Sequence, residues 1–163
     1  MADTLHLTLF DLAATEALAA RAATLVRAGD AILLEGPLGA GKSAFCRAFL
    51  RAAAGDPMLE VPSPSFTLVQ GYDLPSGPAH HFDLYRLSGP DELEELGWDE
   101  ARDGIVLVEW PGRLGWLTPD NALRLSLAPE RGAPPEQTGR RHVTLSGWDT
   151  ARLRTLAAEA GRE

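Results

Sequence analysis

Residues 36–43 combine the residue types and the spacing that bind the phosphates of a nucleotide. They read Gly-Pro-Leu-Gly-Ala-Gly-Lys-Ser, a complete match to the pattern G-x-x-x-x-G-K-[ST]. The glycines allow successive backbone N–H groups to face a polyanion, and the Ser43 hydroxyl is a suitable ligand for Mg²⁺. Lys42 is the only lysine among fifteen basic residues, and its compact ammonium reaches phosphate oxygens that a planar guanidinium meets less easily. The segment therefore predicts a magnesium-dependent nucleotide site.

The segments that flank this loop support the same interpretation. Residues 31–34 are apolar and predict a buried strand, and residues 44–54 have a helical spacing that ends at Gly55. A strand, a glycine loop and a helix in this order point the positive end of the helix at bound phosphates. A chance glycine turn would not require these flanks.

Glu109 closes a second wholly apolar segment, residues 105–108. Open α/β sheets gather their ligands at the carboxyl ends of such strands. A carboxylate there is a suitable ligand for Mg²⁺ or for a water bound to it, and a glutamate also has the reach to orient an attacking water. The alternative interpretation is an acid exposed to solvent at the end of a strand.

Asp83 lies in a strand-like segment with a polar and an apolar face. A period of two places His81, Asp83 and Tyr85 on one face, and Phe82 and Leu84 on the other. The polar face fits three interpretations. It is a solvated sheet edge, Asp83 helps to hold magnesium, or Asp83 acts as a general base beside the γ-phosphate.

Length and composition limit the class of protein. At 163 residues the chain is long enough for one domain with a real core, and we expect residues 1–163 to form a single domain. Its 45% hydrophobic and 23% charged residues are typical of a soluble globular protein. No run is long enough to cross a membrane, and the N-terminus lacks the layout of a signal peptide. We therefore expect a cytoplasmic protein.

The single cysteine and the net charge argue against two further classes. Cys46 alone cannot build a disulfide framework or a multi-cysteine zinc site, and we expect it to fill the core. A formal net charge of -8 disfavours unaided binding of nucleic acid, because neutralised phosphates supply most non-specific affinity. The basic cluster at residues 140–142 is interpreted as a solvated strand end. If RNA is involved, we expect a partner protein to hold it.

Hydrophobic periodicity predicts the remaining elements. Strands are expected over residues 5–10, 66–74, 80–87, 105–108, 121–128 and 141–146, with a hairpin turn at 75–78. Helices are expected from Asp11 until Gly29, over residues 90–96 and from Asp149 to Ala160, with a loop over 129–139. Wholly apolar strands indicate a parallel core, and alternating strands indicate antiparallel additions. We predict a single-domain α/β P-loop NTPase fold, with a mixed parallel and antiparallel sheet flanked by helices.

Taken in order, these motifs resemble the TsaE family, also called YjeE, the P-loop ATPases of bacterial tRNA threonylcarbamoyladenosine (t6A) biosynthesis. The resemblance covers roughly residues 30–112 and is far more specific than any one motif. Besides the phosphate loop it rests on Ser-Pro-Ser-Phe-Thr-Leu-Val at 63–69, His-Phe-Asp-Leu-Tyr-Arg-Leu at 81–87, Asp-Glu-Leu-Glu-Glu-Leu-Gly at 91–97 and Glu-Trp-Pro at 109–111.

The resemblance implies a small mixed α/β ATPase that uses ATP and Mg²⁺ and binds the TsaB and TsaD proteins. These form the synthase that places a threonylcarbamoyl group on an adenosine of tRNA, so contact with tRNA is only indirect. Hydrolysis by the family is thought to support turnover of that assembly.

The family motifs also imply roles for individual residues. They imply that Ser43 and Glu109 hold the magnesium, that Asp83 serves hydrolysis with Lys42 and Glu109, and that Trp110 lies beside the site or at a partner surface. The residues implied around the phosphates are Gly39, Ala40, Gly41, Lys42, Ser43 and Ala44, and Ser65 and Thr67 would lie on a nucleotide-sensing segment.

The chain departs from the family pattern at a few positions. Pro37 stands where the family usually has aspartate, which removes a possible partner for the loop or for TsaD. Ser43 and Ala44 replace a threonine pair, and Ser65 replaces a threonine. Both serines keep the hydroxyl, so the pattern predicts an effect on affinity only.

Other P-loop functions remain as alternatives. A GTPase is disfavoured, because the guanine-reading Asn-Lys-x-Asp motif needs a second lysine. A small-molecule kinase would need a mobile arginine lid, which Arg131, Arg140 and Arg141 are placed to supply. An ATP-gated assembly module would bind ATP with negligible turnover. The adenine pocket is not revealed by the sequence, and residues 11–15 and the late strands are both candidates.

Overall fold

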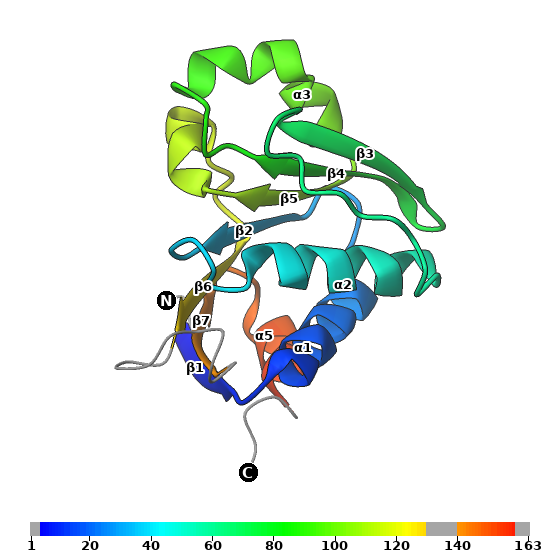
Figure 1. The fold of residues 1–163 in the computed structure, drawn as a ribbon, viewed down its shortest axis with the longest axis vertical. Coiled ribbons are helices and arrows are strands. Elements are labelled where there is room, and N and C mark those ends of the chain that lie inside the picture. Colours follow the sequence, from blue (N-terminus) through cyan, green and yellow to red (C-terminus); the bar gives the residue numbers. More distant parts are fainter. Residues whose placement is uncertain (1–3, 130–139, 159–163) are drawn as a thin grey trace.

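A seven-stranded mixed sheet in the order β1-β7-β6-β2-β5-β4-β3 forms the centre of the protein (Figure 1). The computed structural model describes residues 4–129 and 140–158. The strands are β1 Thr4–Leu9, β2 Ala31–Glu35, β3 Val69–Leu74, β4 Gly77–Asp83, β5 Ile105–Glu109, β6 Leu123–Pro129 and β7 Arg141–Ser146. Strands β6, β2, β5 and β4 run parallel, and β1, β7 and β3 pair antiparallel to their neighbours. The predicted mixed α/β fold is confirmed.

Helices cover both faces of this sheet. The α-helices are α1 Leu12–Leu25, α2 Lys42–Ala54, α3 Trp98–Ala101 and α5 Thr150–Ala157, and 3-10 helices span Pro90–Glu92, Glu94–Leu96 and Pro111–Leu117. One core lies between the sheet and α1, α2 and α5, and a second lies between the sheet and α3 with the 3-10 segments (Figure 1). In β2, Ile32 and Leu34 enter the first core, while Ala31 and Leu33 enter the second. This burial on both faces explains why residues 31–34 of the strand are all apolar.

Three predicted helix ends are confirmed, whereas α1 ends at Leu25 and not at the predicted Gly29. The Asp11 side chain accepts a hydrogen bond of 2.8 Å from the Ala14 amide and starts α1. The Asp149 side chain does the same for α5. Gly55 ends α2 with a left-handed φ of 67°. The last helix is described only to Ala157, and the end predicted for it lies outside the described residues, as does most of the predicted loop over 129–139.

Several predicted bounds were wrong. Strand β3 begins at Val69, because residues 65–68 form a turn in which Leu68 has a φ of 70° and its amide donates to the Pro64 carbonyl. The hairpin turn is shorter than predicted, since Leu74 pairs directly with Gly77. Strand β4 ends at Asp83, so Tyr85 does not share its face.

The connections on the second face were also predicted incompletely. The helix expected over residues 90–96 consists of two 3-10 turns, and neither α3 nor the 3-10 segment Pro111–Leu117 was expected. No helix in the described part of the chain combines the length and apolar character needed to cross a bilayer.

Candidate functional site

The glycine loop joins the carboxyl end of β2 to the first turn of α2. Gly41 precedes the helix with a φ of 108°, a conformation that favours glycine. Gly36 is required for a different reason, because a Cβ atom there would lie 2.5 Å from the Leu127 carbonyl oxygen of β6. The loop is therefore shaped both by its own backbone angles and by its contact with the neighbouring strand.

Lys42 is buried at the start of α2, with 4% of its surface exposed. Its ammonium donates hydrogen bonds to the carbonyls of Gly36 and Pro37, and it lies 3.6 Å from the centre of the Trp110 ring. Burial lowers the pKa of this ammonium, and the nearby carboxylates of Glu109 and Asp83 oppose that shift. The charged group is thus held inside the loop that precedes it.

Glu109 ends β5 and is buried beside Ser43, with 2% of its surface exposed. The Ser43 hydroxyl donates towards the Glu109 carboxylate, with Oγ to oxygen distances of 3.2 and 3.4 Å. His81 Nε2 hydrogen-bonds to the same carboxylate and lies 2.7 Å from its Oε2 atom. The alternative of a solvent-exposed acid at a strand end is therefore wrong.

Asp83 lies beside Glu109, because the two residues are register partners on the parallel strands β4 and β5. Its Oδ2 accepts a hydrogen bond of 3.3 Å from the Ser65 hydroxyl, and its Oδ1 accepts one of 3.1 Å from the Tyr85 amide. Strand β4 has neighbours on both sides, so the interpretation of this face as a sheet edge is wrong. Ser65 thereby joins the site from the turn before β3.

A cleft of about 310 Å³ brings the predicted residues together. It is lined by Gly39, Gly41, Lys42, Ser43, Ala44, Asp83 and Glu109, together with Leu38, Ser63, Ser65 and Trp110. Ala40 is the predicted residue that does not line it. Its side chain is fully buried in the first core, so only its backbone can contribute to the loop surface.

Comparison with known proteins agrees with this geometry. The model of the family described as threonylcarbamoyl adenosine biosynthesis protein TsaE matches residues 9–138. The chain belongs to the TsaE family. A relative carrying that name in Streptomyces coelicolor is 38% identical over 151 residues, which cover 84% of this chain and 95% of that protein.

A relative with the same name in Rickettsia felis is 41% identical over 97 residues. The match covers 59% of this chain and 56% of the Rickettsia protein, so it spans little more than half of that relative. Among solved structures, Bacillus subtilis YdiB superposes with a TM-score of 0.69 at 26% identity and covers 97% of this chain and 95% of its own. The predicted TsaE resemblance is confirmed.

Trp110, which the TsaE motif placed beside the site or at a partner surface, lies at the wall of the cleft. It separates the cleft from a wider groove of about 560 Å³ that Glu35, Pro37 and Arg113 help to line. Its backbone is left-handed, with a φ of 60°, directly after the last residue of β5. This conformation turns the ring back over the Lys42 ammonium.

Arg141 is a residue that sequence reasoning placed wrongly. It begins β7, and its guanidinium donates to the loop carbonyls of Ala40, at 2.7 Å, and Gly39, at 3.2 Å. It braces the phosphate loop and is not merely a solvated strand end. No local signal marks this role, because the contact spans about a hundred residues of sequence. Of the other candidate lid arginines, Arg140 lies over the Phe10 ring and Arg131 is outside the described residues.

Proposed function

We propose that this protein binds ATP with Mg²⁺, hydrolyses it, and thereby serves t6A modification of tRNA together with TsaB and TsaD. One observation carries the proposal. Lys42 and Ser43 of the glycine loop, and the acids Asp83 and Glu109 of two neighbouring strands, line a single cleft. An ammonium, a hydroxyl and two carboxylates are the groups that phosphoryl transfer requires.

The residues at the loop suit a magnesium ion. Ser43 Oγ and the Glu109 carboxylate are hard oxygen donors that already lie 3.2 Å apart, and we assign the ion to this pair. When bound, Mg²⁺ supplies positive charge that neutralises the β- and γ-phosphates. His81 fixes the orientation of the Glu109 carboxylate through its hydrogen bond. Lys42 supplies the second positive charge from within the loop.

Asp83 is suited to act on the attacking water. The Tyr85 amide holds Oδ1, while Oδ2 faces the Ser65 hydroxyl at the cleft. We assign to Oδ2 the acceptance of a proton from water and to Ser65 the positioning of that oxygen. The position of Ser65 next to Asp83 supports its assignment to a segment that responds to the bound nucleotide.

The adenine is best accommodated where the two predicted candidate regions meet. A small pocket of about 90 Å³ is lined by Leu12 and Thr15 of α1, Arg141 of β7, and Gly41 and Ala44 of the loop and helix. It adjoins the phosphate loop through Gly41 and Ala44, which also line the larger cleft. We therefore assign the base to the gap between the start of α1 and β7.

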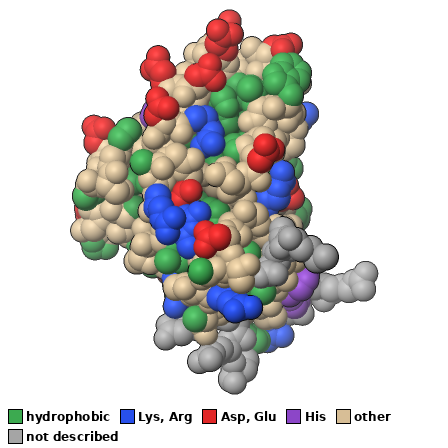
Figure 2. All heavy atoms as spheres, turned by 180° about the vertical axis from the view of Figure 1, so that it is seen from behind, with side chains coloured by type: hydrophobic (Ala, Val, Ile, Leu, Met, Phe, Trp, Pro, Cys, Tyr) green, Lys and Arg blue, Asp and Glu red, His purple; other side chains and the backbone are tan. Residues whose placement is uncertain are grey.

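The charge distribution supports indirect contact with tRNA. The net charge of -8 opposes a polyanion. On the face drawn in Figure 2, acidic side chains gather at one end and basic side chains form separate groups, without a continuous basic track. We infer that TsaB and TsaD hold the tRNA, in the cytoplasm, while this protein supplies ATP hydrolysis.

The small-molecule kinase is disfavoured by the placement of Arg141. A kinase lid moves over the phosphates, whereas this arginine lies on a strand of the central sheet and is bonded to the loop backbone. An ATP-gated module would share the whole cleft, so turnover must separate it from the ATPase.

The test combines calorimetry with turnover. We expect heat of binding for both ATP and ADP in the presence of Mg²⁺, slow phosphate release by the protein alone, and a changed rate when the TsaB and TsaD pair is added. A pull-down from lysate should recover that pair when ATP is present. Nucleotide binding without single-turnover hydrolysis would favour the ATP-gated assembly module. Absence of binding heat for both ATP and ADP would refute the proposal.

The Glu109→Gln variant tests the magnesium assignment. Glutamine keeps an oxygen that can accept the His81 hydrogen bond, so the fold should persist, but it removes the negative charge that favours a cation. We expect the Mg²⁺ concentration for half-maximal phosphate release to rise about tenfold or more. Undiminished magnesium dependence in a folded variant would remove Glu109 from the metal site. The exposed Glu100 supplies the control variant Glu100→Gln, which should behave like the unchanged protein.

The Arg141→Ala variant tests the bracing of the loop. Hydrogen bonds from a charged donor contribute about 1.5 to 3 kcal/mol, and the variant loses the two that hold the carbonyls of Gly39 and Ala40. We expect the ADP affinity, measured by calorimetry, to fall about tenfold. The exposed Arg154 on α5 provides the control variant Arg154→Ala. Equal affinities of the two variants would contradict the role of Arg141.

A further inference from the structure

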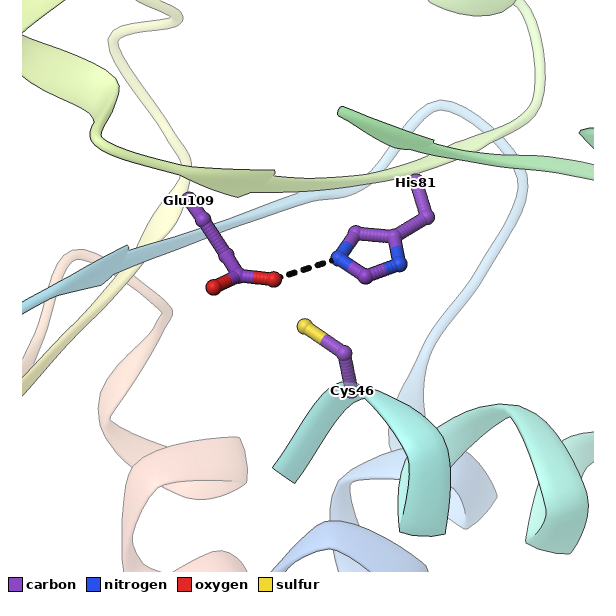
Figure 3. A group of neighbouring side chains, drawn as sticks. All are labelled: Cys46, His81 and Glu109. Carbon is purple, nitrogen blue, oxygen red and sulfur yellow. Dashed lines mark hydrogen bonds and ion pairs between the residues drawn. The ribbon is translucent and has the colours of Figure 1, made fainter. Parts of the chain in front are cut away.

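Three chemically distinct side chains converge beneath the nucleotide cleft (Figure 3). Cys46 comes from the second turn of α2, His81 from the middle of β4 and Glu109 from the end of β5. Their ligand atoms all lie within 4.8 Å of one another, and all three residues are buried. Figure 3 shows the sulfur directed towards the hydrogen-bonded pair of His81 and Glu109. The proposed function uses the carboxylate but not the thiol.

A thiol, an imidazole and a carboxylate form a ligand set for a different class of ion from magnesium. Zn²⁺ binds sulfur at about 2.3 Å and nitrogen or oxygen at about 2.0 to 2.2 Å, usually with four ligands. Magnesium prefers oxygen alone. The ligands of one tetrahedral ion lie roughly 3.3 to 3.6 Å apart, so binding would open the 2.7 Å contact between His81 and Glu109 and draw in the atoms that lie up to 4.8 Å apart.

We propose that Cys46, His81 and Glu109 form a site for a thiophilic divalent cation such as Zn²⁺, with the fourth position open towards the nucleotide cleft. Glu109 belongs to both the cluster and the cleft lining, and so provides the route of entry. Binding forms bonds to Sγ, Nε2 and a carboxylate oxygen. The thiol proton of Cys46 passes to the solvent, and the neutral His81 ring carries its one proton on Nδ1, so that Nε2 can bind the ion.

The surroundings of Cys46 disfavour its thiolate when no cation is bound. Burial raises the pKa of the Cys46 thiol well above its usual range, and the nearby carboxylates of Glu109 and Asp83 add to the shift. A dication in the cluster offsets the same negative charges that disfavour the thiolate.

Occupancy of this site would compete with magnesium for one carboxylate. This competition rests on the proposed function, which assigns Glu109 to Mg²⁺. The proposed cation site itself does not depend on that assignment. A thiophilic cation bound to this cluster would thus inhibit ATP hydrolysis without contact with the adenine.

Cobalt is a suitable probe, because a thiolate bound to Co²⁺ gives a charge-transfer band in the near ultraviolet. Cys46 is the only cysteine of the chain, so such a band reports this residue alone. We expect reduced, metal-free protein without nucleotide to develop the band with one equivalent of Co²⁺ and to lose it when Zn²⁺ is added. Absence of the band at saturating Co²⁺ would overturn the proposal.

Matched variants distinguish cobalt binding at this site from binding at other histidines and from the effects of a general loss of fold. Cys46→Val keeps a small apolar group in the core and should abolish the band, while the thermal unfolding curve reports the fold. His81→Gln should weaken Co²⁺ binding about tenfold or more, and His6→Gln, at an exposed position on β1, should not change it. A band of undiminished affinity in the His81 variant would also overturn the proposal.

The regulatory consequence has its own measurement. We expect Zn²⁺ to inhibit phosphate release, and the Cys46→Val variant to need about tenfold more Zn²⁺ for the same inhibition. The Lys42→Ala variant should keep the cobalt band while losing ATP turnover. In the unchanged protein, a cobalt band without ATP turnover would refute the proposed function alone, and ATP turnover without a cobalt band would refute the cation site alone.

Discussion

Lys42→Ala protein is expected to show no detectable ATP turnover while remaining folded. The ammonium is a buried positive charge within the phosphate loop, and removal of one such preplaced group typically costs about a hundredfold in rate or more. The carbonyls of Gly36 and Pro37 that Lys42 contacts lie beside open clefts, where water can replace it. Phosphate release under single-turnover conditions is the measurement.

The control for this variant lies on the same helix. Arg47 is exposed on α2, five residues after Lys42, and Arg47→Ala removes one positive charge without touching the cleft. We expect its turnover to match that of the unchanged protein. If the Lys42 variant kept more than one tenth of the unchanged protein's turnover, with an unaltered unfolding curve, another group would neutralise the phosphates. A tenfold loss of rate corresponds to roughly 1.4 kcal/mol of barrier.

Asp83→Asn protein is expected to bind nucleotide normally and to hydrolyse it at least about tenfold more slowly, which corresponds to about 1.4 kcal/mol of barrier. Asparagine keeps an oxygen that can accept the hydrogen bond from the Tyr85 amide, but it cannot take a proton from water. Asp83→Ala should give the same kinetic result with an added loss of stability, because the Tyr85 amide then loses its acceptor. Calorimetry gives the affinity, and single-turnover phosphate release gives the rate.

The neighbouring strand offers the control for Asp83. Asp73 is exposed on β3, and Asp73→Asn changes the same charge at a distance from the cleft. If Asp83→Asn lowered affinity and rate by the same factor, Asp83 would act as a metal ligand or a structural residue. A rate equal to that of Asp73→Asn would exclude it from hydrolysis.

The sequence predicts best those features that local chemistry decides. The glycine loop, the apolar segments 31–34 and 105–108 and the caps at Asp11, Asp149 and Gly55 each depend on a few adjacent residues. Burial on both faces explains the apolar residues 31–34 of β2 and 105–108 of β5, so the position of these strands in the sheet centre follows from composition. These elements determine where the strands end, and the predicted site residues lie at those strand ends.

The features that were missed depend on contacts between distant segments. Arg141 reaches the loop only because β7 returns beside β6, and a run of two arginines before a histidine gives no sign of that. The bond between His81 and Glu109 likewise requires that β4 and β5 be neighbours. The turn at residues 65–68, with Leu68 in a left-handed conformation, contradicts the strand propensity of its own sequence.

The Glu109 carboxylate is held by two hydrogen-bonding residues, Ser43 and His81, through contacts within the chain alone. A glutamate side chain loses about 1.5 to 2 kcal/mol of rotamer freedom when it is fixed in one position. Here that loss falls on folding, so a cation that binds later meets a preorganised ligand. The stability of the whole domain, and not the affinity for the ion, bears the entropic cost of the site.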